Sequence, residues 1–93
     1  MSLHRRNPKR DKSEAEIVLA LQACGFTVAR LSGANVPDLL LGKNSVDRTA
    51  EVKTGTAKLR KGQQAWADAW RGARPLVLRD LDDVRMLAAC WPL

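Results

Sequence analysis

The sequence is poor in the residues that most often carry nucleophilic catalysis, soft-metal binding or cross-links. Its 93 residues include one histidine and two cysteines, and tyrosine is absent. Two cysteines are too few for the disulfide framework of a small secreted protein, and no C-x-x-C pair is available to hold zinc. The single His4 excludes a histidine-rich metal cluster and argues against serine–histidine chemistry.

Long apolar runs are missing too, although 45% of the residues are hydrophobic, an ordinary share for a globular fold. No run reaches the ~20 residues of a membrane-spanning helix, and no signal-peptide core follows the basic N-terminus. We therefore expect a cytoplasmic protein that has no membrane partner.

Acidic residues are outnumbered, and this excess of positive charge favours a polyanionic partner such as DNA. Sixteen Lys and Arg stand against ten Asp and Glu, which gives a net charge of +6 and a pI near 10.0. We expect residues 1–12 to form a flexible basic arm and residues 13–93 a single domain. The arm is either a solvated tail or a phosphate-binding strap. The candidate DNA-binding residues are Arg5, Arg6, Lys9 and Arg10 in the arm, and Lys58, Arg60 and Lys61 in a polar loop.

The apolar spacing and the turn formers predict an α/β fold with the order helix, three strands, helix, strand, helix. Ser13 and Glu16 have the spacing of a capping box at the start of the first helix, and Gly25 is placed to end it. The expected strands cover residues 26–31, 38–41, 46–53 and 75–79. The expected later helices cover residues 63–71 and a segment that Asp80 or Asp82 caps and that ends at residue 90.

The most informative stretch places two carboxylates and a lysine on neighbouring strands. Side chains alternate along a strand, so Glu51 and Lys53 share one face while Ala50 and Val52 face the core. A hairpin between the two strands brings Asp38 alongside Glu51. We expect the charged residues to face a cleft or solvent.

These residue types suit metal-assisted hydrolysis of a phosphodiester bond. Mg²⁺ prefers oxygen ligands and often binds one or two carboxylates, together with water and substrate phosphate. Lys53 would offset charge that develops at phosphorus, and carry a proton only secondarily. The alternative is structural, because an Asp after Pro is commonly a turn former and an exposed E-x-K is commonly a solvated ion pair.

Pro37-Asp38 and Glu51-Val52-Lys53 resemble the two halves of the PD-(D/E)XK nuclease signature. The closer resemblance is to the small stand-alone VRR-NUC nucleases of phages and bacteria, which are similar to Holliday-junction resolvases. It covers residues 11–79 and adds Glu16, Leu21 with Gly25, Gly33 with Pro37 to Leu40, and Gln63 with Trp66 and Trp70. It implies a restriction-endonuclease-like core, with a mixed central sheet flanked by helices, and a bacterial or phage-infected cell as the setting.

The resemblance also implies roles for individual residues. Asp38 and Glu51 would bind Mg²⁺, for which Mn²⁺ substitutes, and the Val52 carbonyl would be a third ligand. Lys53 would be catalytic, and no small-molecule cofactor is expected.

The resemblance also implies roles for Glu16 and Gln63, each with an alternative. Glu16 would be an outer carboxylate on the first helix, in competition with its capping role, and Glu14 is the less favoured alternative. Gln63 would lie near Lys53 or contact the DNA backbone, in preference to Gln64. An ordinary surface glutamine is the bland interpretation of both.

The expected function is a metal-dependent DNA endonuclease that acts on branched or Holliday-junction DNA as a homodimer. Resolving a four-way junction requires two symmetric cuts, which a two-fold dimer supplies. The alternatives are a nickase or other phage DNA-processing nuclease with the same site, or an inactive nuclease-fold module that binds nucleic acid. Trp66, Trp70 and Trp91 are expected mainly to pack in the core, with base stacking or a dimer seam as alternatives.

Overall fold

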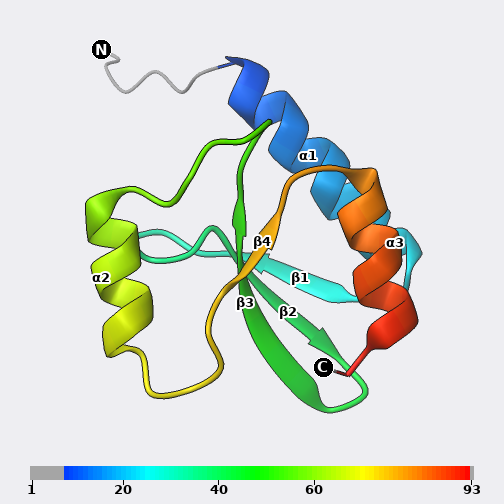
Figure 1. Cartoon of the computed structure of the whole chain (residues 1–93). Helices are drawn as coiled ribbons and strands as arrows, with labels where there is room; N and C mark the ends of the chain where they lie inside the picture. The colour runs from blue at the N-terminus through cyan, green and yellow to red at the C-terminus, as the bar shows by residue number, and fades with distance from the viewer. Residues whose placement is uncertain (1–7, 93) are drawn as a thin grey trace.

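A computed structural model describes residues 8–92, with side chains from Lys12 onward. This part of the chain forms three helices and four strands in the predicted order (Figure 1). The elements are α1 (Pro8–Ala23), β1 (Thr27–Arg30), β2 (Leu39–Lys43), β3 (Val46–Val52), α2 (Lys61–Ala69), β4 (Leu76–Leu78) and α3 (Leu81–Cys90). The predicted α/β class and the element order are therefore confirmed.

The four strands form one mixed sheet in the order β1-β2-β3-β4. The pairs β1–β2 and β2–β3 are antiparallel, whereas β3 and β4 are parallel and are joined through α2. The β2–β3 turn falls at Asn44 and Ser45, whose φ angles of 53° and 64° are those of a tight hairpin turn. This hairpin fixes the register in which Leu39 lies opposite Ala50.

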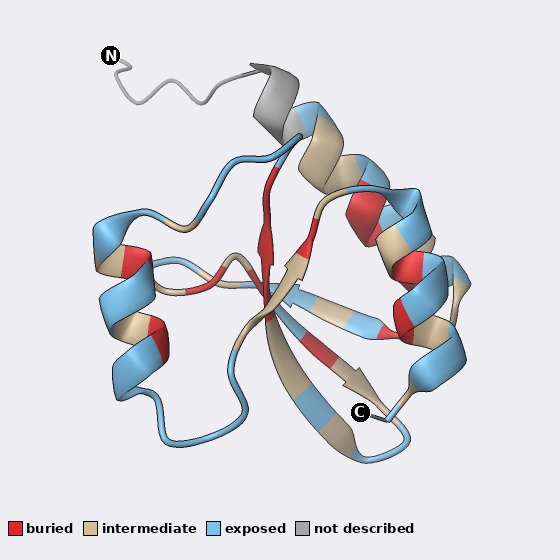
Figure 2. Cartoon of the chain, viewed as in Figure 1, coloured by how far each residue is buried: buried red, intermediate tan, exposed pale blue. Residues whose placement is uncertain are grey.

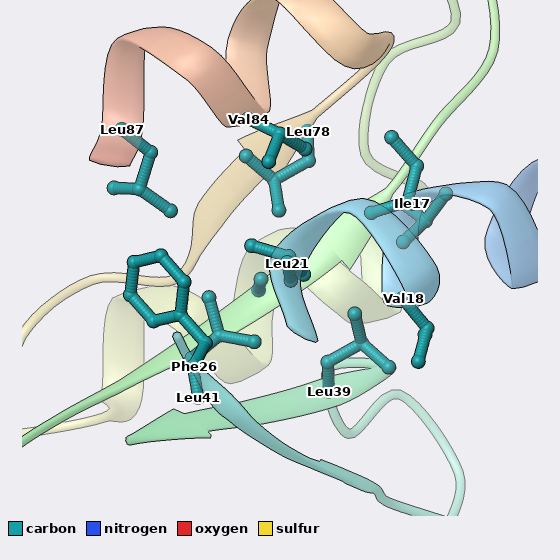
Figure 3. Packing of buried hydrophobic residues seen from close by; sticks show 11 residues of the cluster. Ile17, Val18, Leu21, Phe26, Leu39, Leu41, Leu78, Val84 and Leu87 are labelled. Carbon is teal, nitrogen blue, oxygen red and sulfur yellow. The ribbon is translucent and has the colours of Figure 1, made fainter. Parts of the chain in front are cut away.

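The two faces of the sheet are covered by different helices. α1 and α3 lie on one face, and α2 lies on the other (Figure 1). The apolar core fills the space under α1 and α3, where buried side chains from both helices meet those of the strands (Figures 2 and 3). Its members are Ile17, Val18, Leu21, Phe26, Leu39, Leu41, Ala50, Val52, Leu78, Val84 and Leu87.

The first helix begins earlier than the sequence predicts. It starts at Pro8, a residue that is tolerated in the first turn of a helix because its missing N–H would have no partner there. Ser13 therefore lies inside α1, and the predicted capping box with Glu16 is wrong. Its end is as predicted, since Gly25 follows with a φ of 92°.

The same extension changes the predicted basic arm. Residues 8–12 belong to α1, so the boundary between arm and domain does not lie at residue 12. Lys9 and Arg10 are part of this helix, whereas Arg5 and Arg6 lie outside the described residues.

The tryptophans divide into two groups. Trp91 packs edge to face on Phe26, with ring centroids 4.8 Å apart, and its indole N–H donates to the Lys43 carbonyl at 2.9 Å. Trp66 and Trp70 stack on each other along α2, and Trp70 is 49% exposed. The core-packing prediction holds for Trp91 and is wrong for the α2 pair, because that helix buries only Gln63 and Ala67.

Candidate active site

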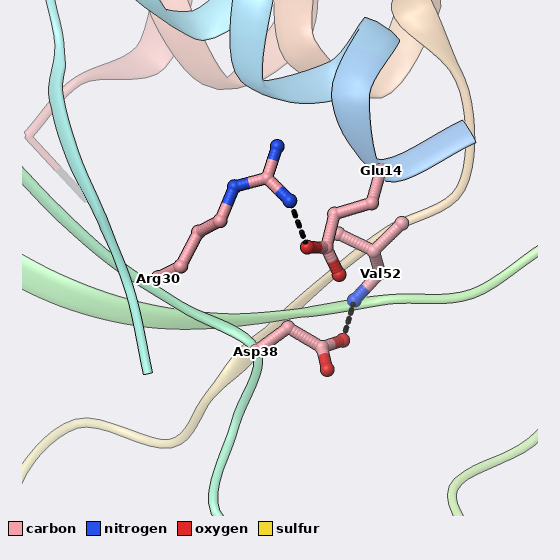
Figure 4. A network of polar contacts seen from close by, with 4 residues as sticks. All are labelled: Glu14, Arg30, Asp38 and Val52. Carbon is pink, nitrogen blue, oxygen red and sulfur yellow. Dashed lines mark hydrogen bonds and ion pairs between the residues drawn. The ribbon is translucent and has the colours of Figure 1, made fainter. Parts of the chain in front are cut away.

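Asp38 is held against β3 from its position just before β2. The register that pairs Leu39 with Ala50 places Asp38 beside Glu51. The Val52 backbone N–H donates to Asp38 Oδ2 at 2.7 Å (Figure 4). The carbonyl of Asp38 in turn accepts from the Leu31 N–H at 2.8 Å, so its backbone is fixed as well. The predicted approach of Asp38 to the Glu51–Lys53 segment is present.

Glu51 and Lys53 lie on the face of β3 opposite to Ala50 and Val52, as strand alternation predicts. Both are buried, with 1% and 8% exposure, and this differs from the expected open cleft or solvent-facing surface. The reason is α2, which lies over this face of the sheet (Figure 1). Burying charged groups is costly unless they are hydrogen-bonded, paired or bound to a metal.

Gln63, from the first turn of α2, bridges the two charged residues. Lys53 Nζ donates to Gln63 Oε1 at 2.7 Å, and Gln63 Nε2 donates to Glu51 Oε1 at 3.3 Å. Gln63 Oε1 also accepts from the Arg60 N–H at 2.9 Å, so the same side chain caps α2. Of the two proximities expected for Gln63, the one to Lys53 is therefore present.

Gln64 points elsewhere. Its side chain donates to Asp68 Oδ1 at 3.0 Å on the exposed side of α2. Asp68 also accepts from Arg74 Nη2 at 3.0 Å. The preference for Gln63 over Gln64 agrees with these positions.

The two glutamates of α1 are placed in the reverse of the expected order. Glu14 is only 17% exposed in its side chain, forms a 2.7 Å ion pair with Arg30, and points towards the region of Asp38 and the Val52 N–H (Figure 4). Glu16 is exposed and lines a shallow hollow with Arg79 and Asp80. Residues two positions apart on a helix lie on different faces, so only one of Glu14 and Glu16 can face Asp38.

The expectation of Glu16 as the outer carboxylate is thus not met by the geometry. That expectation came from the resemblance, in competition with a capping role that the observed start of α1 at Pro8 removes. Glu14 is the helix carboxylate that lies nearest the site.

Arg30 was not singled out from the sequence. It ends β1 and lies opposite Leu39, and its guanidinium reaches Glu14 on α1. The signal lies in the pairing of β1 with β2, which places the residue opposite Leu39 next to the Asp38 position. Recognising it required the register, which the sequence alone did not supply.

The basic loop residues lie at the entrance of α2. Lys58, Arg60 and Lys61 are all exposed, and the backbone of Arg60 is bonded to Gln63. Arg79 holds the same loop, since Nη1 donates to the carbonyls of Gly55 at 3.0 Å and Ala57 at 2.7 Å. Three positively charged side chains therefore lie on a tethered segment that ends at the polar cluster, which consists of Glu51, Lys53 and Gln63.

The donor set fits a hard divalent cation that keeps several waters. Asp38 and Glu51, which the register places opposite each other, could supply carboxylate oxygens, and Val52 between Glu51 and Lys53 could supply a backbone carbonyl. In the part of the chain that the structure describes, no group of three or more His, Cys, Asp or Glu side chains is arranged to hold a metal. One or two carboxylates with waters is the usual set for Mg²⁺, whereas soft metals prefer Cys and His ligands and all-protein cages need more oxygen donors.

Comparisons of the chain with protein-family models, curated proteins and solved structures found no match. Between residues 8 and 92, no helix has both the length and the apolar character needed to cross a membrane.

Proposed function

We propose that this protein is a Mg²⁺-dependent endodeoxyribonuclease that hydrolyses phosphodiester bonds at the site formed by Asp38, Glu51 and Lys53. One observation carries the proposal: Glu51, Lys53 and Gln63 are buried together between β3 and α2, and Asp38 is hydrogen-bonded to the backbone of β3. Burying charge in this way adds little to stability, so a chemical role accounts for it better than a structural one.

The residues of the site have separate roles in the proposed reaction. Asp38, Glu51 and the Val52 carbonyl would hold Mg²⁺, which when bound polarises a phosphoryl oxygen and lowers the pKa of a coordinated water. Lys53 carries a positive charge beside them, and Gln63 fixes its ammonium group through the 2.7 Å bond. An ammonium group in this position stabilises the negative charge that develops at phosphorus.

The fold and the motif support the same proposal. The observed order of elements, the mixed sheet and the positions of Pro37-Asp38 and Glu51-Val52-Lys53 agree with a restriction-endonuclease-like PD-(D/E)XK core. In such an arrangement the DNA backbone would approach the site along the exposed Lys58, Arg60 and Lys61. Binding would then depend on phosphate charge and DNA shape more than on base sequence.

Branched DNA, Holliday junctions in particular, is the substrate that we propose, and a homodimer is the acting form. A small catalytic domain makes one cut per site, so paired symmetric cuts require two sites related by a two-fold axis.

The decisive experiment is a cleavage assay in Mg²⁺ or Mn²⁺ on a labelled four-way junction, a flap, a linear duplex and a single strand. We expect paired symmetric nicks in the junction, and their loss in Asp38→Asn while binding persists. Asp47→Asn is the matched control, because it makes the same change at an exposed aspartate on β3.

Other outcomes separate the alternatives. Cleavage of another substrate would retain the chemistry and replace the junction by that substrate. Wild-type protein that binds DNA and cuts none of the four would contradict the nuclease proposal in favour of an inactive binding module. Equal cleavage by wild type and Asp38→Asn would remove Asp38 from the site.

A further inference from the structure

Trp66 on α2 and Trp70 at the end of this helix present an aromatic surface that the apolar core does not use. The rings of Trp66 and Trp70 stack with centroids 4.9 Å apart and planes inclined by 14°. Trp66 is partly buried, and Trp70 has 49% of its surface exposed. The inner ring therefore supports the outer one, and the outer ring is accessible.

The Trp70 ring packs closely against the backbone at Gly72. A Cβ added at Gly72 would lie 2.7 Å from Trp70 Nε1, so the indole edge rests closely on the backbone at this glycine. The Trp70 backbone N–H also donates to the Trp66 carbonyl at 3.0 Å. A ring fixed in this way loses little conformational freedom when a ligand stacks on it.

Trp66 lies on the helix that carries Gln63, and Trp70 is the C-cap residue that directly follows this helix. Gln63 and Ala67 are the buried residues of α2, and Trp66 and Trp70 each follow one of them by three positions. Residues three apart are neighbours on a helix surface, so both indoles flank the face that covers the site. Trp70 is seven residues beyond Gln63, about 10 Å along the axis at ~1.5 Å per residue. That distance corresponds to roughly three base steps of ~3.4 Å.

The charges around the pair suit a polyanion. Arg71 directly follows Trp70 and is exposed, and the basic loop precedes the other end of α2. Asp68, the single acid of α2, accepts hydrogen bonds from Gln64 and Arg74, which lower its pKa, and the Arg74 guanidinium offsets its charge. An aromatic ring among cations is the combination that binds single-stranded nucleic acid, since every base has a face on which to stack.

We propose that Trp70, supported by Trp66, is a stacking platform for an unpaired nucleobase, so that branched DNA is bound with a base unpaired near its branch point, a few nucleotides from the cut. The inference rests on the proposed function in taking DNA as the ligand. It adds that this ligand is recognised through an unpaired base. A second copy of the chain covering the indoles is the competing occupant.

The test measures binding without divalent metal, so that cleavage plays no part. Fluorescence anisotropy compares a labelled 20-nucleotide oligothymidylate, the same strand with abasic sites at its centre, and a 20-base-pair duplex. We expect the wild-type chain to bind the intact strand about tenfold more tightly than the abasic strand, which carries the same phosphates. Trp70→Ala should lose that preference and bind the duplex as the wild type does.

Two further variants control for folding and for loss of apolar surface. Trp70→Phe keeps a ring and should keep most of the preference. Met86→Ala shortens a side chain on α3 that is 66% exposed, and should leave all three affinities unchanged. Thermal unfolding followed by circular dichroism establishes that each variant is folded.

Two results would overturn the inference. One is a wild-type chain that binds the intact and abasic strands equally. The other is a folded Trp70→Ala variant that keeps the preference. Light scattering that shows a wild-type dimer and a Trp70→Ala monomer, with no base preference in either, would assign the indoles to a dimer interface.

A base preference in a chain that cuts no DNA would refute the nuclease proposal alone, and cleavage without base preference would refute the platform alone.

Discussion

The two faces of β3 are built from alternate residues of one short strand, and they differ in what burial achieves. Ala50 and Val52 pack into the apolar core beneath α1 and α3. Glu51 and Lys53 are buried equally well beneath α2, where their contacts include hydrogen bonds with Gln63. Low exposure alone therefore does not distinguish a residue that stabilises the fold from one that serves the site.

The chemistry of the buried groups makes the distinction. Apolar side chains gain free energy when they leave water, whereas a buried charge loses hydration that its new partners only partly replace. The apolar face thus stabilises the sheet, and the polar face is maintained at some cost to stability. Substitutions on the two faces should separate activity from stability.

The largest effect is expected where the two buried charges, Glu51 and Lys53, are removed together. In the double variant Glu51→Leu with Lys53→Met, side chains of similar volume replace the two charges. We expect cleavage to disappear, while the free energy of unfolding stays unchanged or rises by up to ~4 kcal/mol. Urea unfolding together with the junction assay tests this, and a marked loss of stability would mean that the cluster holds the sheet together.

A core substitution should have the opposite signature. Leu39 is fully buried at 0% exposure, on the apolar face of β2. Leu39→Ala should lower the free energy of unfolding by ~2–5 kcal/mol, because it removes buried methyl groups and leaves a cavity. Leu40→Ala, at the neighbouring position with 37% exposure, is the control and should cost clearly less in the same urea titration. Equal losses at both positions would contradict the assignment of the two faces.

The smallest expected effect concerns Glu14 of α1, a helix that covers the apolar face of the sheet. The Glu14 side chain forms an ion pair with Arg30 and holds it near Asp38 (Figure 4). Glu14→Gln should slow cleavage by about tenfold, the size of effect that supporting residues of metal sites commonly have. Glu16→Gln makes the same change on another face of α1 and should leave the rate unaltered. Single-turnover rates on one substrate compare the two, and the reverse order would restore Glu16 as the helix carboxylate.

Local patterns in the sequence were enough to predict the order of elements, the β2–β3 hairpin and the alternation along β3. Each depends on neighbours in the chain, such as the turn at Asn44 and Ser45 or the glycine after α1. The meeting of Asp38 with the Glu51–Lys53 segment followed from that hairpin. The proximity of Gln63 to Lys53 came from the resemblance, and the structure contains it.

The features that were missed depend on contacts between distant segments. The packing of α1 on the sheet decides that Glu14 and not Glu16 faces Asp38, and the apolar spacing in the sequence did not show this. The position of α2 over β3 turned a charged pair expected near solvent into a buried one. The same position left Trp66 and Trp70 outside the core, although their spacing suits a packed helix equally well.

The attachment of α2 has a consequence for the order in which the molecule opens. This helix buries only two residues, and its N-terminal turn fits closely against the loop before Asp38, because a Cβ at Gly62 would lie 2.3 Å from Asn35 Oδ1. Beyond that fit, Arg79 tethers the preceding loop through two carbonyls. Segments with so little buried apolar surface exchange their amide hydrogens through partial unfolding, well below the free energy of global unfolding. The amides of α2 should therefore exchange before those of β2 and β3, and the polar cluster should come apart and reassemble while the apolar core stays folded.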